Sequence, residues 1–158
     1  MNKKQITPLL YETYLAVVKN SVGSNIFRNF YAKINGKKVD IMRNGDLSCA
    51  FYVSSILTMF QLIQKPHGTI ESTVKDLAQS GWKKVKAPKI GSVLIWENLN
   101  FDDGETHKHI GFYIGNNKAV SNSEKLGQPN IHHWTYGTAK GKPVRKVEAI
   151  YWNKKFKA

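Results

Sequence analysis

The spacing of apolar residues changes once along this chain, near Gly81, and this change limits the folds that the sequence can adopt. Before Gly81, apolar residues recur at three- and four-residue steps, which is typical of helices. After Gly81 they form short runs rich in β-branched and aromatic residues, which favour strands. Helices followed by strands predict an α+β fold with an antiparallel sheet, because a parallel sheet needs the two to alternate.

Three segments predict helices in the first part of the chain, namely 8–20, 47–64 and 70–80. The pair Asn35-Gly36 tolerates the positive φ of a tight turn, so 30–34 and 38–41 are predicted to form a β-hairpin. About five strands are predicted after Gly81, at 92–97, 109–114, 118–122, 130–135 and 145–152. Exposed loops are predicted at 102–105 and 138–143, and a basic tail at 154–158.

Composition fits one globular domain spanning 1–158. An apolar share of 41% with 7 Phe, 7 Tyr and 4 Trp is enough for a core and excludes a disordered chain. The single cysteine forms no internal disulfide. A formal charge of +13 favours polyanionic partners such as nucleic acid, anionic lipid or an acidic cell wall.

No export signal or membrane span is predicted. Tyr11, Glu12 and Thr13 interrupt the apolar core that a signal peptide needs, so we expect synthesis in the cytoplasm without a classical leader. The most apolar stretch, 50–60, is shorter than the roughly 18–20 residues that cross a bilayer. We therefore expect a soluble protein with no transmembrane segment.

Cys49 follows a turn at Asn44-Gly45 and falls in the first turn of the helix predicted at 47–64. Unpaired N–H groups at a helix N-terminus favour a thiolate, so this position predicts a thiol pKa lowered toward neutrality. Cysteine is also among the most buried residue types, and a small core side chain is the alternative interpretation.

A nucleophilic cysteine needs a base, and His67, His107, His109, His132 and His133 are the candidates. His109 is favoured because it opens a predicted strand. In that strand His109, Gly111 and Tyr113 share one face, and Gly111 leaves room for a substrate. The alternative is a polar histidine at a junction between loop and strand.

Three blocks of residues resemble the papain-like cell-wall peptidases and amidases of the NlpC type and the related CHAP (cysteine, histidine-dependent amidohydrolase/peptidase) domains. Residues 47–53, Leu-Ser-Cys-Ala-Phe-Tyr-Val, are similar to the family's nucleophile block Asp-Cys-Ser-Gly-Phe-Val. Residues 91–96, Gly-Ser-Val-Leu-Ile-Trp, resemble the strand Gly-Asp-Leu-Val-Phe-Phe. Residues 109–115, His-Ile-Gly-Phe-Tyr-Ile-Gly, resemble the histidine block His-Val-Gly-Ile-Tyr-x-Gly.

The resemblance covers about 44–152 and leaves 1–43 as an extension with a helix and a hairpin. It implies a papain-like fold, no cofactor, and hydrolysis of peptidoglycan stem peptides or related amides by Cys49 and His109. Ser48 stands where the family has an aspartate, and Ala50-Phe51 where it has Ser-Gly. Tyr31 is the candidate for the family's pocket tyrosine.

A third polar residue should orient the imidazole of His109. The family pattern places it at Ser121. If Asn116-Asn117 instead form a two-residue hairpin loop, Gly111 lies opposite Asn122, which then shares the face of His109. Both remain candidates, with His132 and His133 as the fallback.

The implied mechanism is acyl transfer: Cys49 attacks an amide carbonyl, His109 takes and returns the proton, and the backbone N–H of Cys49 helps to hold the oxyanion. An intracellular amidase, an acyltransferase or a toxin-like effector fits the same scaffold.

Two alternatives come from other classes of protein. A zinc site would use His107 and His109 with one of His132 and His133, because neighbouring strand residues point to opposite faces. A nucleic-acid-binding module fits the charge and the aromatic residues Trp82, Trp134 and Tyr136, which we expect to be exposed, but no binding signature accompanies the lysines.

Overall fold

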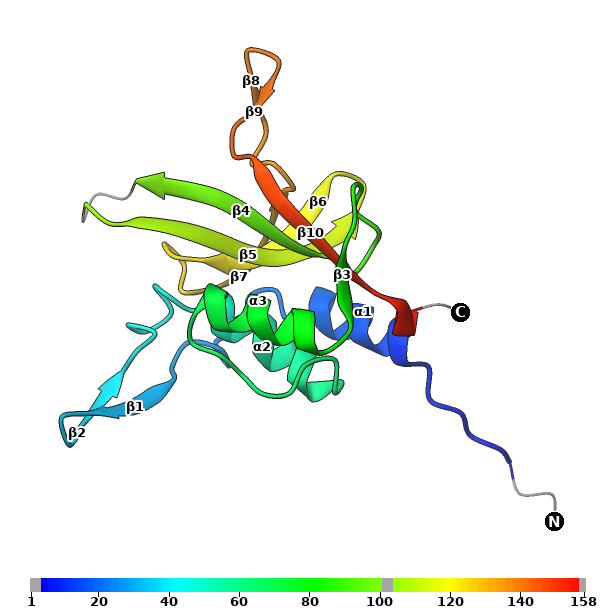
Figure 1. The fold of residues 1–158 in the computed structure, drawn as a ribbon, viewed down its shortest axis with the longest axis horizontal. Coiled ribbons are helices and arrows are strands. Elements are labelled where there is room, and N and C mark those ends of the chain that lie inside the picture. Colours follow the sequence, from blue (N-terminus) through cyan, green and yellow to red (C-terminus); the bar gives the residue numbers. More distant parts are fainter. Residues whose placement is uncertain (1–3, 101–103, 157–158) are drawn as a thin grey trace.

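A computed structural model describes residues 4–100 and 104–156 as an α+β structure (Figure 1). A six-stranded antiparallel sheet has the order β3-β10-β4-β5-β6-β7. Its strands are β3 (Trp82–Lys84), β4 (Val93–Asn100), β5 (Thr106–Gly115), β6 (Lys118–Ser123), β7 (Gln128–His133) and β10 (Val147–Asn153). All five predicted strands are present, and β3 adds an edge strand that the sequence analysis missed.

The three helices are α1 (Leu10–Asn20), α2 (Cys49–Met59) and α3 (Ile70–Gln79), and each contacts β5. Helix α1 begins two residues after its predicted start, because Leu9 is extended and acts as the N-cap. Helix α2 is shorter than predicted: the chain turns at Gln61, which has a φ of 53°, and Leu62 then enters the core. None of the helices in the described ranges is both long and apolar enough to cross a membrane.

The sheet separates two apolar clusters. The larger one joins the helices to one face and includes Tyr52 of α2, Phe112 of β5 and Val120 of β6. The smaller one lies on the other face and includes Trp96 of β4 and Ala119 of β6. Alternation along a strand therefore assigns each side chain of β5 and β6 to one face or the other.

The C-terminal residues differ from the exposed basic tail that was predicted. A 3-10 helix, η1 (Lys154–Phe156), follows β10, and Phe156 is buried against the rings of Tyr14 and Trp82. Trp82, taken above as an exposed aromatic residue, is also buried, and its Nε1 donates to the carbonyl of Leu62. Residues 157 and 158 of the predicted tail lie outside the described residues.

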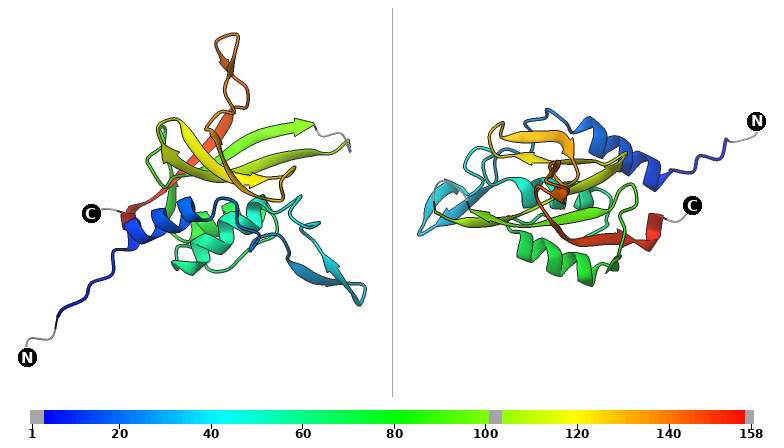
Figure 2. Two further views of the ribbon diagram at one scale, coloured as in Figure 1. Left: turned by 180° about the vertical axis from the view of Figure 1, so that it is seen from behind. Right: turned by 90° about the horizontal axis from the view of Figure 1, so that it is seen from above.

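Two hairpins project from the body (Figure 2). The predicted one consists of β1 (Tyr31–Ile34) and β2 (Lys37–Asp40), with positive φ at Asn35 and Gly36. The second is formed by β8 (Thr138–Ala139) and β9 (Lys142–Pro143), where a loop was predicted. Of the other predicted loop, 102 and 103 lie outside the described residues.

Asp40 fixes the chain where the hairpin β1–β2 meets the body. Its carboxylate accepts hydrogen bonds from Asn29 Nδ2 and from the backbone N–H groups of Phe30, Met42 and Asn44. These bonds outweigh the opposing effect of desolvation and lower the pKa of Asp40.

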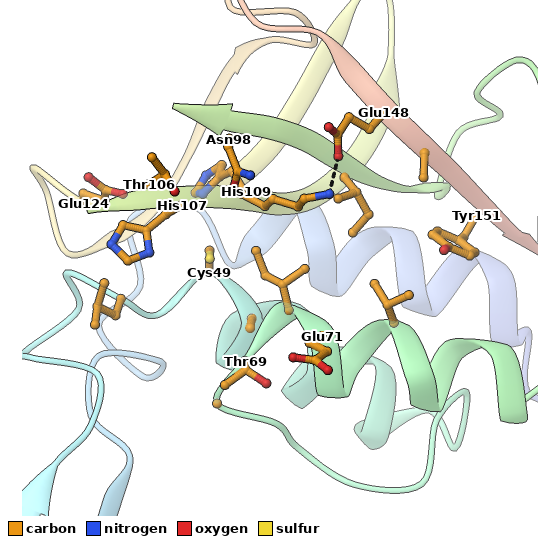
Figure 3. A pocket seen from close by; sticks show the side chains of 18 of the residues that line it. Cys49, Thr69, Glu71, Asn98, Thr106, His107, His109, Glu124, Glu148 and Tyr151 are labelled. Carbon is orange, nitrogen blue, oxygen red and sulfur yellow. Dashed lines mark hydrogen bonds and ion pairs between the residues drawn. The ribbon is translucent and has the colours of Figure 1, made fainter. Parts of the chain in front are cut away.

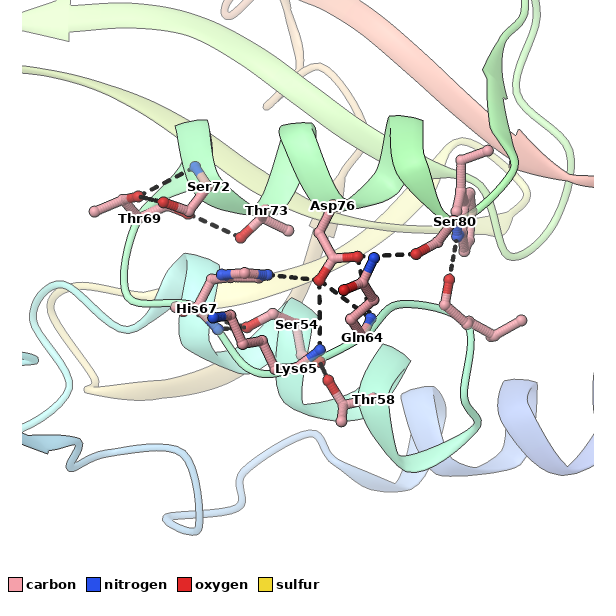
Figure 4. A network of polar contacts seen from close by, with 12 residues as sticks. Ser54, Thr58, Gln64, Lys65, His67, Thr69, Ser72, Thr73, Asp76 and Ser80 are labelled. Carbon is pink, nitrogen blue, oxygen red and sulfur yellow. Dashed lines mark hydrogen bonds and ion pairs between the residues drawn. The ribbon is translucent and has the colours of Figure 1, made fainter.

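Asp76 organises the segment between α2 and α3 (Figure 4). Its buried carboxylate accepts from His67 Nε2 at 2.7 Å, from Ser80 Oγ at 2.8 Å and from the backbone N–H of Gln64 at 3.1 Å. Burial alone would raise the pKa of Asp76, but these hydrogen bonds outweigh it and lower the pKa. The network holds the helix that forms one wall of the site described below.

We expect Asp76→Ala to lower the free energy of unfolding by about 3 kcal/mol at neutral pH, because it leaves buried donors unpaired. The native pKa lies below the ordinary value of 3.8, so the contribution of Asp76 is present above about pH 4 and is lost as the pH falls through the native pKa. Urea unfolding at several pH values measures this, with the exposed Asp46 replaced by alanine as control. A constant difference between wild type and Asp76→Ala down to strongly acidic pH would contradict it.

Candidate functional site

Cys49 is the first residue of α2, as the sequence predicted, and its side chain is partly exposed. It lines a cavity of about 860 Å³ bounded by α3, the start of α2 and the strands β4, β5 and β10 (Figure 3). His109 of β5 lines the same cavity. The two residues that sequence analysis selected as nucleophile and base therefore line the same cavity.

The thiol of Cys49 is not activated in the way that its helix position suggested. Burial raises its pKa to about 11, although the backbone N–H groups of Ala50 and Ile110 oppose this by hydrogen bonding to the sulfur. The prediction of a pKa near neutrality is thus wrong, because loss of solvent outweighs the field of the helix terminus. Cys49 is a neutral thiol in the resting protein.

Strands β5 and β6 separate close to Ile110 and His109. Strands β5 and β6 are paired from Gly115↔Lys118 to Gly111↔Ser121, and pairing ends there. Beyond this point β5 continues beside β4 and β6 beside β7, so the two strands separate. Ile110, whose backbone N–H acts to lower the pKa of the Cys49 thiol, lies where they part, next to His109 in the chain.

His109 belongs to a chain of polar side chains that crosses three strands. Its Nε2 lies 2.9 Å from Ser121 Oγ on β6, which lies 2.7 Å from His132 Nε2 on β7. The Nδ1 of His132 lies 2.8 Å from the carbonyl oxygen of His133. The Ser121 oxygen also lies 3.3 Å from the hydroxyl of Tyr136, whose ring stacks on His132.

The direction of every hydrogen bond in this chain follows from its last member. A backbone carbonyl only accepts, so Nδ1 of His132 carries a proton. Burial lowers the pKa of His132, so its ring is neutral and its Nε2 accepts the hydroxyl proton of Ser121. Ser121 Oγ is left to accept the N–H at Nε2 of His109. In neutral His109, the ring proton is therefore assigned to Nε2.

Electrostatics keep His109 neutral. Burial lowers its pKa to about 3, the charge of Arg145 and the nearby His132 act in the same direction, and a hydrogen bond to the backbone of Asn122 opposes them. No hydrogen bond joins the Cys49 sulfur to the His109 ring among the described residues. The resting site therefore holds a thiol and a neutral imidazole and no ion pair between them.

Asn122 does not orient His109 through its side chain, contrary to the prediction from strand register. Gly115 pairs with Lys118 as expected, but the register shifts by one residue between Tyr113 and Gly115, so Gly111 pairs with Ser121. This bulge accompanies a φ of 90° at Gly115. It places Ser121, the position implied by the family pattern, on the face of His109 and turns Asn122 to the opposite face.

Asn122 instead holds the loop that precedes the nucleophile. Its Nδ2 donates to the carbonyl of Gly45 at 2.7 Å. Gly45 has a φ of 97°, and a Cβ there would lie 2.5 Å from the carbonyl oxygen of Gly127 in the turn between β6 and β7. Arg28 also donates to the carbonyls of Leu126 and Gly127. These contacts fix the start of α2 against the sheet.

The remaining predicted pocket residues lie outside the cavity. Ser48 is fully buried, and its hydroxyl donates to the carbonyl of Arg28. Gly111 makes room for the sheet and not for a substrate, because a Cβ there would lie 2.5 Å from the carbonyl oxygen of Val120. Tyr31 is exposed on the hairpin β1–β2, where the ammonium of Lys38 lies 4.3 Å from its ring centre.

Sequence analysis missed two residues beside the chain of polar side chains formed by His109, Ser121 and His132. Arg145 is buried, donates to the carbonyls of Glu97 and His107, and lies 5.8 Å from the ring of Tyr136. Tyr136 was taken as an exposed aromatic residue, but it is half-buried. A charged residue at the start of a predicted strand was the available signal for Arg145; nothing in the local sequence indicated that Tyr136 folds back onto the sheet.

The metal alternative receives no support from side-chain positions. In the described ranges, no three of the His, Cys, Asp and Glu side chains lie close enough together to hold a metal ion. His132 is engaged with Ser121, and Nδ1 of His133 accepts from the backbone N–H groups of Thr135 and Gly137. Both histidines therefore have other bonding roles.

Comparison with models of known protein families gives no match to this chain, and comparison with curated protein sequences gives none either.

Proposed function

We propose that this protein is a cysteine-dependent amide hydrolase that works through an acyl-enzyme. The observation that carries the proposal is the shared cavity: Cys49 stands at the N-terminus of α2, and His109 reaches the same cavity with its Nε2 held by Ser121. A thiol at a helix N-terminus and a base with a fixed tautomer are the two components that acyl transfer requires.

The protonation states favour base-assisted attack. With a thiol pKa of about 11 and an imidazole pKa of about 3, proton transfer ahead of attack is strongly uphill. The thiol proton therefore passes to the unprotonated ring nitrogen of His109 while the sulfur forms its bond to the carbonyl carbon. A hydrogen bond between a nucleophile and its base often forms or shortens only when substrate is bound. The backbone N–H of Cys49, in the first turn of α2, is the candidate donor to the oxyanion.

The second half of the reaction returns the proton. His109 gives it to the leaving amine as the C–N bond breaks, and the acyl group remains on the sulfur. Water then attacks the thioester with His109 again as base, releasing the carboxylic acid and restoring the thiol. Throughout the cycle, Ser121 and His132 keep the ring of His109 in one orientation.

The substrate class follows from the resemblance to papain-like cell-wall enzymes of the NlpC and CHAP type. We propose a papain-like arrangement of helices on the sheet and, as substrate, a peptidoglycan stem peptide or a related peptide amide. The positive charge of the chain, +13, suits an enzyme that acts close to anionic wall polymers.

The test is turnover of synthetic stem peptides and simple peptide amides by wild type and by Cys49→Ala. We expect hydrolysis by wild type and a fall to the uncatalysed rate in the variant, with unchanged thermal unfolding. Cys49→Ala removes one sulfur atom from a partly exposed position, so the fold should persist. Equal turnover by the two proteins would remove Cys49 from the mechanism.

A further inference from the structure

The hairpin β1–β2 is fixed at its base and projects into solvent beyond it (Figure 2). At the base, Phe30 stacks on Phe51 of α2, and the carboxylate of Asp40 accepts the backbone N–H of Phe30. Beyond the base the two strands pair only with each other, and every residue of 31–40 except Ala32 and Asp40 is exposed. The base therefore sets the direction of an element whose two faces are both open to a partner.

The positive charge of the hairpin has no counterion within it. Lys33 and Lys38 lie directly opposite each other and share one face, where like charges destabilise a strand pair. Among the described residues, no carboxylate forms an ion pair with Lys33, Lys37 or Lys38. Asp40 is the one acidic residue of 31–40, and its carboxylate is bonded to the backbone. An anionic partner would therefore bind these lysines and also relieve their repulsion.

The opposite face of the hairpin is largely aliphatic. Ala32 lies opposite Val39, and Ile34 lies opposite Lys37, so these four side chains share the second face. Ile34 is 50% exposed and Val39 is 37% exposed. An isolated two-stranded ribbon gains stability when such a face is covered. The hairpin thus presents apolar surface and unpaired positive charge within about 13 Å, the length of four strand residues.

Anionic partners differ in what they offer the aliphatic face. Nucleic acid and acidic wall polymers supply phosphate or carboxylate groups but no acyl chains. The surface of a bilayer supplies both, with anionic headgroups outside and hydrocarbon beneath them. Tyrosine, represented here by Tyr31, is enriched at that boundary, and lysine can lay its stem along hydrocarbon while its ammonium stays among the headgroups. Interfacial elements bury an apolar face about 5–10 Å deep, which this hairpin can reach.

We propose that the hairpin β1–β2 attaches the protein to the surface of a bilayer that contains anionic lipid. The hairpin enters tip first, so that lipid surrounds both faces. Ile34, next to the turn, lies deepest, and Lys33 and Lys38, one pair further from the turn, bind headgroup phosphates. The formal charge of +13 attracts the chain to such a surface, and the hairpin determines which part makes contact. No residue of 31–40 lines the cavity described above, so the inference is independent of the proposed hydrolase function.

The experiment measures flotation of the full chain with two kinds of vesicle at one fixed ionic strength. One kind is phosphatidylcholine alone, and the other is equal parts of phosphatidylcholine and phosphatidylglycerol. We expect wild type to bind the mixed vesicles about a hundredfold more tightly, because each of three lysines near an anionic surface contributes about fivefold. Lys33→Gln/Lys38→Gln should weaken binding to the mixed vesicles about 25-fold.

The matched control is Lys140→Gln/Lys142→Gln. It removes the same charge from the exposed hairpin β8–β9, which projects from another part of the molecule (Figure 1). Because salt screens charges that are distant from the contact, binding should fall by less than about twofold. Equal losses in the two double variants would assign binding to the overall charge and would overturn the role of the hairpin β1–β2.

Ile34→Ser distinguishes a bilayer from other polyanions. Ile34 is half-exposed, so thermal unfolding should not change, whereas binding to the mixed vesicles should weaken about fivefold through lost apolar burial. Attachment to lipid is wrong if wild type does not bind the mixed vesicles, or if Ile34→Ser binds them as well as wild type does. Single-stranded DNA, tested with the same variants, then shows whether the lysines serve a nucleic acid instead.

Discussion

Replacing His109 by alanine is expected to reduce kcat/KM for a hydrolysed peptide amide by about a thousandfold, because it removes both the base and the acid of the cycle. Because the ring of His109 is buried and bonded to Ser121, the variant should also lose thermal stability, so its activity is measured well below its own unfolding temperature. His107→Ala is the matched control: His107 lies two residues away on β5 and lines the same cavity. It should retain most of the activity.

Two further measurements test whether Cys49 and His109 act as a unit. The double variant Cys49→Ala/His109→Ala should be no slower than either single variant, because residues that serve one step are not additive. The kcat/KM of wild type should be flat between about pH 5 and about pH 9, since the relevant pKa values are about 3 and about 11. A rate that rises through an inflection near neutrality would contradict the neutral pair.

Replacing Gly45 by alanine is expected to lower the free energy of unfolding by at least about 3 kcal/mol and to impair turnover. The backbone there has a φ of 97°, and the new Cβ would lie 2.5 Å from the carbonyl oxygen and 2.7 Å from the Cα of Gly127. Neither atom can move without shifting the turn between β6 and β7. The loop that precedes Cys49 would be pushed away from the sheet.

Gly36→Ala provides the comparison that isolates this contact. Gly36 also has a positive φ, 79°, but nothing lies within 4 Å of a Cβ built there. Its replacement should cost about 1–2 kcal/mol from backbone strain alone and leave turnover unchanged. Both variants are compared by urea unfolding. Equal destabilisation would mean that the approach of Gly45 to Gly127 has no energetic weight.

The order of elements was predictable because periodicity reports local structure. The change near Gly81 gave the α+β class, and the position of Cys49 relative to α2 followed from its place between a turn and an uninterrupted apolar run. The edge strand β3 and the burial of Phe156 were not predictable in this way. Both depend on packing between residues far apart in the chain.

The candidate site was predictable in its residue types and not in its chemistry. A bulge next to Gly115 decides whether Ser121 or Asn122 lies on the face of His109. A shift of one residue in strand pairing moves each of these side chains to the other face of the sheet. The pKa of Cys49 depends on tertiary burial, which sequence position does not report. The contacts of Ser121 with His132 and Tyr136 depend on the pairing of β6 with β7. This pairing is a long-range feature, so local sequence does not predict these contacts.

The bonds at Asp40 separate two regions of very different expected stability. The ribbon β1–β2 is paired only with itself, and Lys33 lies directly opposite Lys38, so it should open by local fluctuation far more readily than the main sheet. Asp40 binds the backbone of Met42 and Asn44 on the side toward the nucleophile. Opening of the hairpin β1–β2 can therefore stop at the carboxylate of Asp40. The position of Cys49 should then be unaffected by this opening.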